Sequence, residues 1–152
     1  MKKVFLLLQS ICLLMFASFN VANAQDAVYT GYFSNKAVSG YDVVAYFTEQ
    51  KAVEGNSQYT LEYQGADWYF SSQEHLTLFK NDPEKYAPQY GGYCAWAMAV
   101  DKIAPGKAPY WTIYNDKLYL NYDKDVLDTW LADKDKFIKD ADLVWSKLDK
   151  EL

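Results

Sequence analysis

The stretch Tyr90-Gly91-Gly92-Tyr93-Cys94 decides how the chain around it folds. Two adjacent glycines let the backbone turn through angles closed to other residues, and they allow something to approach closely. The apolar run that follows, residues 94–100, predicts a short helix with Cys94 in its first turn. Because the first turn of a helix carries free N–H groups and the positive end of the dipole, this position favours a thiolate. A second interpretation is that Cys94 is a small buried apolar residue, as free cysteine often is.

The first 24 residues have the pattern of a secretory signal peptide. Lys2 and Lys3 form a positive start, residues 4–19 are mostly apolar, and Ala22-Asn23-Ala24 fits the small-x-small cleavage rule. We expect cleavage after Ala24, which would place the mature chain in the periplasm or outside the cell. No second long apolar segment follows, so no membrane span is expected after cleavage.

The mature chain, residues 25–152, has the length of one domain with a real core. Since two of the 15 lysines belong to the leader, 13 lysines face 20 acids, a net charge of −7, and the sequence has no arginine. A negative surface without arginine argues against nucleic-acid binding and against anionic membranes. Cys94 is the one cysteine of this part, so an intramolecular disulfide is excluded. A lone thiol in an oxidising compartment is buried, metal-bound, reactive or paired with another chain.

Two hairpins are predicted from alternating residues and turn signals. Residues 59–63 alternate with period two, residues 64–66 form a turn, and residues 67–70 return as an antiparallel strand. A second hairpin joins residues 110–114 to residues 117–121. Residues 43–47 are apolar and predict a short buried strand or a half-turn, and residues 25–36 predict an extended arm.

Helices are predicted from caps and from apolar spacing. Ser71-Ser72-Gln73-Glu74 has the pattern of a capping box with Ser71 as N-cap, and the helix that follows places His75, Leu78 and Phe79 on one side. Asp82 followed by Pro83 starts a second helical turn. Asp123 caps a later helix, and residues 137–148 form a last amphipathic one. These elements indicate an α+β fold: a small antiparallel sheet of hairpins packed against short helices, with C-terminal helices.

With these elements aligned, the chain resembles the YHS domain family, and more closely its secreted, single-domain branch. The matching stretches are residues 37–47, 68–70, 82–94, 111–113 and 118–122. The resemblance implies a role near heavy-metal handling. In metal-type relatives the strand before the helix ends in Phe-Cys-Ser, and a second cysteine follows four residues after the first. Those two positions hold Ser71 and His75 here.

The first functional hypothesis is therefore a heavy-metal site. His75 occupies a ligand position by resemblance, Cys94 is the available thiol, and Met98 lies four residues after Cys94 on the same helix face. Two sulfurs and an imidazole would favour Cu(I), whereas Cys94 and His75 with a carboxylate such as Asp42 would suit Zn(II).

Two alternatives stay open beside a copper or zinc site. One is a non-catalytic module that binds a small ligand or a protein partner through residues near the glycine turn: Tyr41, Trp68, Tyr90, Gly91, Gly92, Tyr93 and Trp96. The same aromatic rings are also expected in a core. The other alternative is a thiol enzyme with Cys94 as nucleophile and His75 as base. No partner that would orient His75 and no resolving cysteine are identifiable, so we expect no enzyme.

Overall fold

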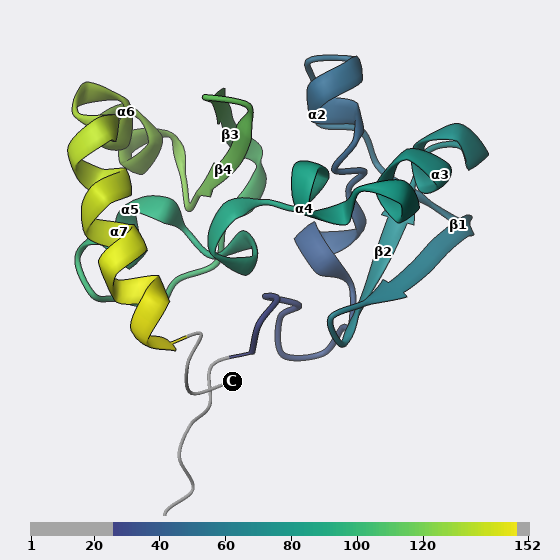
Figure 1. Cartoon of the computed structure of the whole chain (residues 1–152), viewed down its shortest axis with the longest axis horizontal. Helices are drawn as coiled ribbons and strands as arrows, with labels where there is room; N and C mark the ends of the chain where they lie inside the picture. Colours follow the sequence, from purple (N-terminus) through teal and green to yellow (C-terminus); the bar gives the residue numbers. More distant parts are fainter. Residues whose placement is uncertain (1–25, 149–152) are drawn as a thin grey trace, which may run out of the picture.

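The computed structural model describes residues 26–148, and the predicted signal peptide, residues 1–24, lies outside this part of the chain. Short helices and two hairpins follow one another along the described chain (Figure 1). In chain order the elements are η2 (Ala37–Gly40), α2 (Ala45–Thr48), β1 (Asn56–Tyr63), β2 (Ala66–Phe70), α3 (Gln73–Asn81), α4 (Pro83–Tyr86), η3 (Gln89–Gly92), α5 (Ala95–Ala99), β3 (Lys107–Tyr114), β4 (Lys117–Asn121), α6 (Lys124–Ala132) and α7 (Lys134–Leu148). No helix within residues 26–148 is both long enough and apolar enough to span a membrane.

The first hairpin, β1 and β2, forms where the alternating residues predicted it. Leu61 pairs with Trp68, and the turn residues Gln64 and Gly65 both have positive φ, which matches the right-handed twist of the two strands. Strand β2 buries every second residue, with Trp68 and Phe70 facing inward. The ring of Phe79 from α3 lies 4.8 Å from that of Trp68, centroid to centroid, so the apolar side of α3 covers this hairpin as expected.

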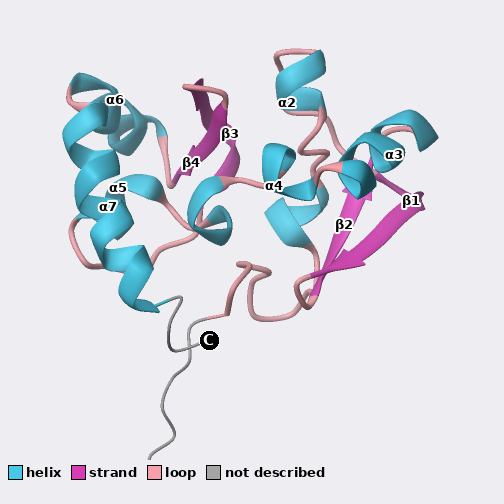
Figure 2. Ribbon diagram, viewed as in Figure 1, coloured by secondary structure: helices cyan, strands magenta, loops and turns pink. Residues whose placement is uncertain are grey.

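The second hairpin, β3 and β4, is also confirmed. Ile113 pairs with Leu118, and Asn115 and Asp116 form the turn with positive φ. Figure 2 shows that the two hairpins form separate two-stranded sheets, and helices complete the α+β fold. The predicted fold class is therefore correct, although one continuous sheet does not form.

Strand β4 connects two hydrophobic clusters. Leu118 and Leu120 belong to the cluster that also contains Trp68 and Phe70 of the first hairpin. Tyr119, which points to the opposite side of the strand, packs in a second cluster with the C-terminal helices. Both faces of β4 are therefore covered after its exposed first residue, Lys117, and residues 118–121 are all buried.

The C-terminal helices follow the predicted pattern. Asp123 caps α6 by accepting the N–H of Val126 at 2.9 Å. The apolar stripe of α7 packs into the second cluster through Phe137, Ile138, Ala141, Val144, Trp145 and Leu148. In Figure 1, α5, α6 and α7 gather on one side of the molecule, while α2, α3 and the first hairpin lie on the other, with α4 between them.

Two local predictions are decided by the structure. Of the two alternatives for residues 43–47, the half-turn forms and the strand does not, because the chain turns into α2 at Ala45. The N-cap of α3 is Ser72 and not Ser71, since the hydroxyl of Ser72 accepts the N–H of His75 at 3.2 Å. Ser71 is instead held by the buried carboxylate of Asp42, whose charge makes it the stronger acceptor.

Candidate functional site

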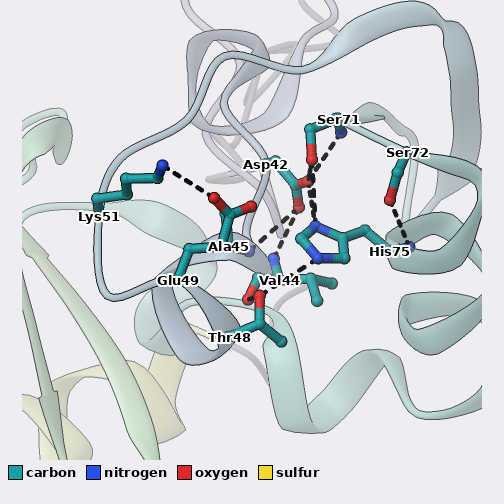
Figure 3. A network of polar contacts seen from close by, with 9 residues as sticks. All are labelled: Asp42, Val44, Ala45, Thr48, Glu49, Lys51, Ser71, Ser72 and His75. Atoms are coloured by element: carbon teal, nitrogen blue, oxygen red, sulfur yellow. Dashed lines mark hydrogen bonds and ion pairs between the residues drawn. The ribbon is translucent and has the colours of Figure 1, made fainter.

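A buried carboxylate organises a polar network at the start of α2 and α3. Asp42 is fully buried, and its Oδ1 accepts the N–H groups of Val44 at 2.9 Å and of Ala45 at 3.4 Å (Figure 3). These two N–H groups stand at the beginning of α2, where they lack partners within the helix. Asp42 therefore caps α2 with a charge that complements the positive end of the helix.

The second oxygen of the same carboxylate joins this turn to the first hairpin and α3. Asp42 Oδ2 accepts the backbone N–H of Ser71 at 2.8 Å and its hydroxyl at 2.7 Å. It also lies 2.6 Å from Nδ1 of His75, so that ring nitrogen donates to the carboxylate. Five donors around one carboxylate satisfy a charge that would otherwise be costly to bury.

His75 contacts a hydroxyl through its other nitrogen. Nε2 lies 3.3 Å from Oγ1 of Thr48, and that hydroxyl lies 3.1 Å from the carbonyl of Val44. The order carboxylate, imidazole, hydroxyl is the order found in hydrolase triads. Here, however, Thr48 has a backbone acceptor for its hydroxyl hydrogen. The side chain of His75 is 11% exposed, and the three hollows described below are not lined by it. These contacts join α2 to the first turn of α3, and both nitrogens of the ring have a partner.

Cys94 lies elsewhere, at the N-cap of α5, and this helix is on the same side of the molecule as α7 (Figure 1). The residue is 1% exposed, and its thiol lies 3.7 Å from Oδ1 of Asn121. Burial raises the pKa of the Cys94 thiol above its usual value and outweighs the backbone N–H groups of Ala97 and Trp96, which lower it. The structure therefore has the buried thiol of the second interpretation and not a thiolate stabilised by the helix end.

The four predicted metal ligands separate into two groups. Asp42 and His75 contact each other, whereas Cys94 and Met98 belong to the α5 segment, across the molecule from α3 (Figure 1). Met98 is fully buried in the second hydrophobic cluster. Within residues 26–148, no group of three His, Cys, Asp or Glu side chains is placed to hold a metal ion. The predicted donors Asp42, His75, Cys94 and Met98 therefore do not fit one heavy-metal centre in this arrangement.

The glycine turn has the close approach that the sequence predicted, and the approaching segment is the protein's own N-terminal arm. Tyr90, Gly91 and Gly92 all have positive φ. A Cβ on Gly91 would lie 2.0 Å from the carbonyl oxygen of Ala27, and Tyr29 donates its N–H to the carbonyl of Gly91 at 2.9 Å. The turn thus serves to pin residues 27–29 against the body of the protein.

A cleft of about 390 Å³ opens beside this turn. It is formed by the arm, the first hairpin, the α4–η3 segment, the turn of the second hairpin and α7. Its lining residues are Ala27, Val28, Tyr63, Gln64, Trp68, Glu84, Ala87, Pro88, Gln89, Tyr90, Gly91, Lys117 and Trp145. The volume lies within the range of about 300–1,000 Å³ that is usual for small-molecule sites.

The predicted pocket residues are distributed over several places. Trp68, Tyr90 and Gly91 line the cleft, as the ligand hypothesis required. Tyr41 lines a second, largely polar hollow together with Glu54, and Tyr93 lines a third, smaller one near the arm. The two remaining candidates are not among the lining residues: Gly92 is buried, and Trp96 packs against the second cluster.

Sequence reasoning missed several residues of the cleft, above all Tyr63, Glu84, Lys117 and Trp145. They come from four separate elements, and no spacing in the sequence relates them. The sequence places Trp145 only on the apolar stripe of α7. In the structure its ring also contacts the rings of Tyr90 and Tyr93.

These observations define a small α+β domain with a buried aspartate–histidine network and an aromatic cleft at a glycine turn. In a comparison with known protein families, residues 44–90 match the model of the YHS domain family. The match runs from the start of α2 to Tyr90 and so includes Thr48, Ser71 and His75. Asp42, the second hairpin and the C-terminal helices lie outside it. No significant match to a curated protein or to a solved structure was found.

Proposed function

We propose that this protein is an exported, non-catalytic binding module whose ligand is a small molecule held in the cleft at the glycine turn. The observation that carries the proposal is the convergence of five separate segments on one cleft of about 390 Å³. Its walls combine aromatic rings with a few polar groups, which is the composition expected of small-ligand sites.

The wall of the cleft is built rigidly, as a binding site needs. Trp68 is buried and its indole N–H is held by the carbonyl of Tyr63 at 2.9 Å. The hydroxyl of Tyr90 donates to Asp142 at 2.8 Å. Because these rings are fixed by contacts within the protein, little conformational freedom is lost when a ligand packs against them.

The experiment is a titration of ¹⁵N-labelled protein with three probes of different chemistry: indole, cyclohexanol and maltose. We expect at least one probe to cause saturable shifts at the amides of Gln64, Gln89 and Gly91. Filling the cleft with Ala87→Phe should abolish the shifts, while Ala132→Phe, at an exposed position of α6, should leave them unchanged. If no probe shifts these amides, or if Ala87→Phe has no effect, the cleft is not the binding site.

The absence of catalysis in this proposal is supported by the state of the two candidate groups. The Cys94 thiol is buried with a raised pKa, which opposes nucleophilic attack. His75 lies in a different element and contacts Asp42 and Thr48. The thiol enzyme predicted as an alternative would need both groups at one opening.

A copper or zinc ion bound through Cys94 and His75 stays a prediction of the sequence, and it would require these residues to leave their present partners. Titration of the purified protein with Cu(I) and Zn(II) tests it against the Cys94→Ser and His75→Ala variants. Stoichiometric binding that is lost in both variants would restore the metal hypothesis and displace the cleft from the main function.

Export is proposed on the basis of the leader sequence. Sequencing the N-terminus of the protein isolated from its native compartment would test it, and we expect the chain to begin at Gln25. A chain that keeps residues 1–24 would contradict cleavage.

A further inference from the structure

Three polar side chains of the cleft have no hydrogen-bond partner within the described part of the protein. Gln64 and Gln89 contribute two amides, and the indole N–H of Trp145 is a donor. None of these three groups makes a hydrogen bond to another of residues 26–148. They are therefore available to a ligand, and together they supply both donors and acceptors.

Two opposite charges also line the cleft without pairing with each other or with any other described residue. Glu84 lies in the first turn of α4, and Lys117 begins β4. Neither side chain forms an ion pair or hydrogen bond within residues 26–148. Their charges sum to zero, and the sequence has no arginine with which to clamp a carboxylate or phosphate. The lining thus favours a ligand that carries no net charge.

The aromatic surface of the cleft is apolar but only partly exposed. Tyr63 and Trp145 are half-buried, whereas Trp68 and Tyr90 are buried. A half-buried ring offers a flat apolar face, and a ligand with a flat array of C–H groups packs well against it. The ligand must therefore have an apolar face as well as many hydrogen-bonding groups.

A saccharide ring has all of these properties. One face of a pyranose presents C–H groups, and each hydroxyl is both donor and acceptor, so it can pair with an amide, a carboxylate, an ammonium or an indole N–H. We propose that the cleft binds a neutral saccharide, with its ring on Trp145 or Tyr63 and its hydroxyls on Gln64, Gln89, Glu84 and Lys117. This inference rests on the proposed function, and it names the class of ligand.

The proposal is tested with maltose, cellobiose and N,N′-diacetylchitobiose, titrated into the ¹⁵N-labelled protein and followed at the backbone amides and at the indole N–H of Trp145. We expect saturable shifts at the cleft for at least one saccharide. Glucuronate and glucosamine serve as the charged counterparts and should bind more weakly than the neutral saccharides.

The matched variants are Glu84→Gln and Glu74→Gln, since both acids stand in the first turn of a helix and only Glu84 lines the cleft. Because hydrogen bonds to a charged group are the strong ones, Glu84→Gln should weaken saccharide binding by about tenfold. Glu74→Gln should leave it unchanged. Gln89→Ala provides a second test of the cleft that does not depend on charge.

The outcomes separate the two proposals. Shifts at the cleft with indole or cyclohexanol but with no saccharide would overturn the saccharide inference and leave the binding module standing. Saccharide shifts confined to residues outside the cleft, or equal losses in Glu84→Gln and Glu74→Gln, would also overturn it. If no probe of any class shifts the cleft, both proposals fall.

Discussion

Removal of the buried carboxylate of Asp42 should destabilise the protein more than any surface substitution. The carboxylate accepts hydrogen bonds at 2.9 Å from Val44, at 2.8 Å and 2.7 Å from Ser71 and at 2.6 Å from His75. Asp42→Ala leaves these buried donors without an acceptor, and each buried unsatisfied group costs about 1–3 kcal/mol. Because several of these donors lose their acceptor at once, we expect the free energy of unfolding to fall by about 3 kcal/mol or more.

The measurement is urea unfolding followed by circular dichroism. With a slope of about 1–3 kcal/mol per M, the midpoint should fall by more than about 1 M. Asp82→Asn is the matched control, because Asp82 caps α4 at the surface and asparagine caps as well as aspartate. Its midpoint should hardly move.

The pair itself is isolated by a double-mutant cycle with His75→Ala. Because His75 and Asp42 are in direct contact, we expect a coupling free energy of about 1–3 kcal/mol. A coupling below about 0.5 kcal/mol, or a loss below about 1 kcal/mol in Asp42→Ala, would refute the view that this network holds α2 to α3.

Three further predictions follow from burial and backbone geometry. Cys94 should resist 5,5′-dithiobis(2-nitrobenzoate) in the native protein and react fully in guanidinium, as mass mapping of the labelled peptide would show; rapid native labelling would contradict its 1% exposure. Gly91→Ala should lower the free energy of unfolding by at least about 2 kcal/mol, since the new Cβ meets Ala27 and the backbone is left-handed. Gly65→Ala, also at positive φ but with nothing nearby, should lower it by about 1 kcal/mol. Equal losses in urea unfolding would refute the docking of the arm. Burial raises the pKa of Tyr119 to about 12 and raises those of Tyr46 and Tyr90 further, so the free energy of unfolding should fall as the pH rises above about 10, where unfolded tyrosine ionises. The part of the absorbance at 295 nm that comes from these three buried tyrosines should therefore rise in step with the loss of circular dichroism. Their ionisation before unfolding would contradict this.

The sequence by itself determined the elements whose causes are local. Period-two alternation with a Gln64-Gly65 turn specified the first hairpin, and the caps Asp82 and Asp123 specified where α4 and α6 begin. The spacing of three and four along residues 137–148 specified the buried stripe of α7. In each case the residues that decide the structure lie within a few positions of one another, so their pattern can be recognised without the fold.

Only the tertiary structure decided which polar groups meet. Asp42 and His75 are 33 positions apart in the sequence. Ser71 does not cap α3 as predicted, because the fold brings the Asp42 carboxylate within hydrogen-bonding distance of its hydroxyl. The cleft is formed by five segments, and no spacing in the sequence indicates that they meet. Whether Cys94 is a thiol or a thiolate also depends on the fold. The helix end lowers the pKa of a thiol and burial raises it, so the outcome depends on how deeply the chain buries the sulfur.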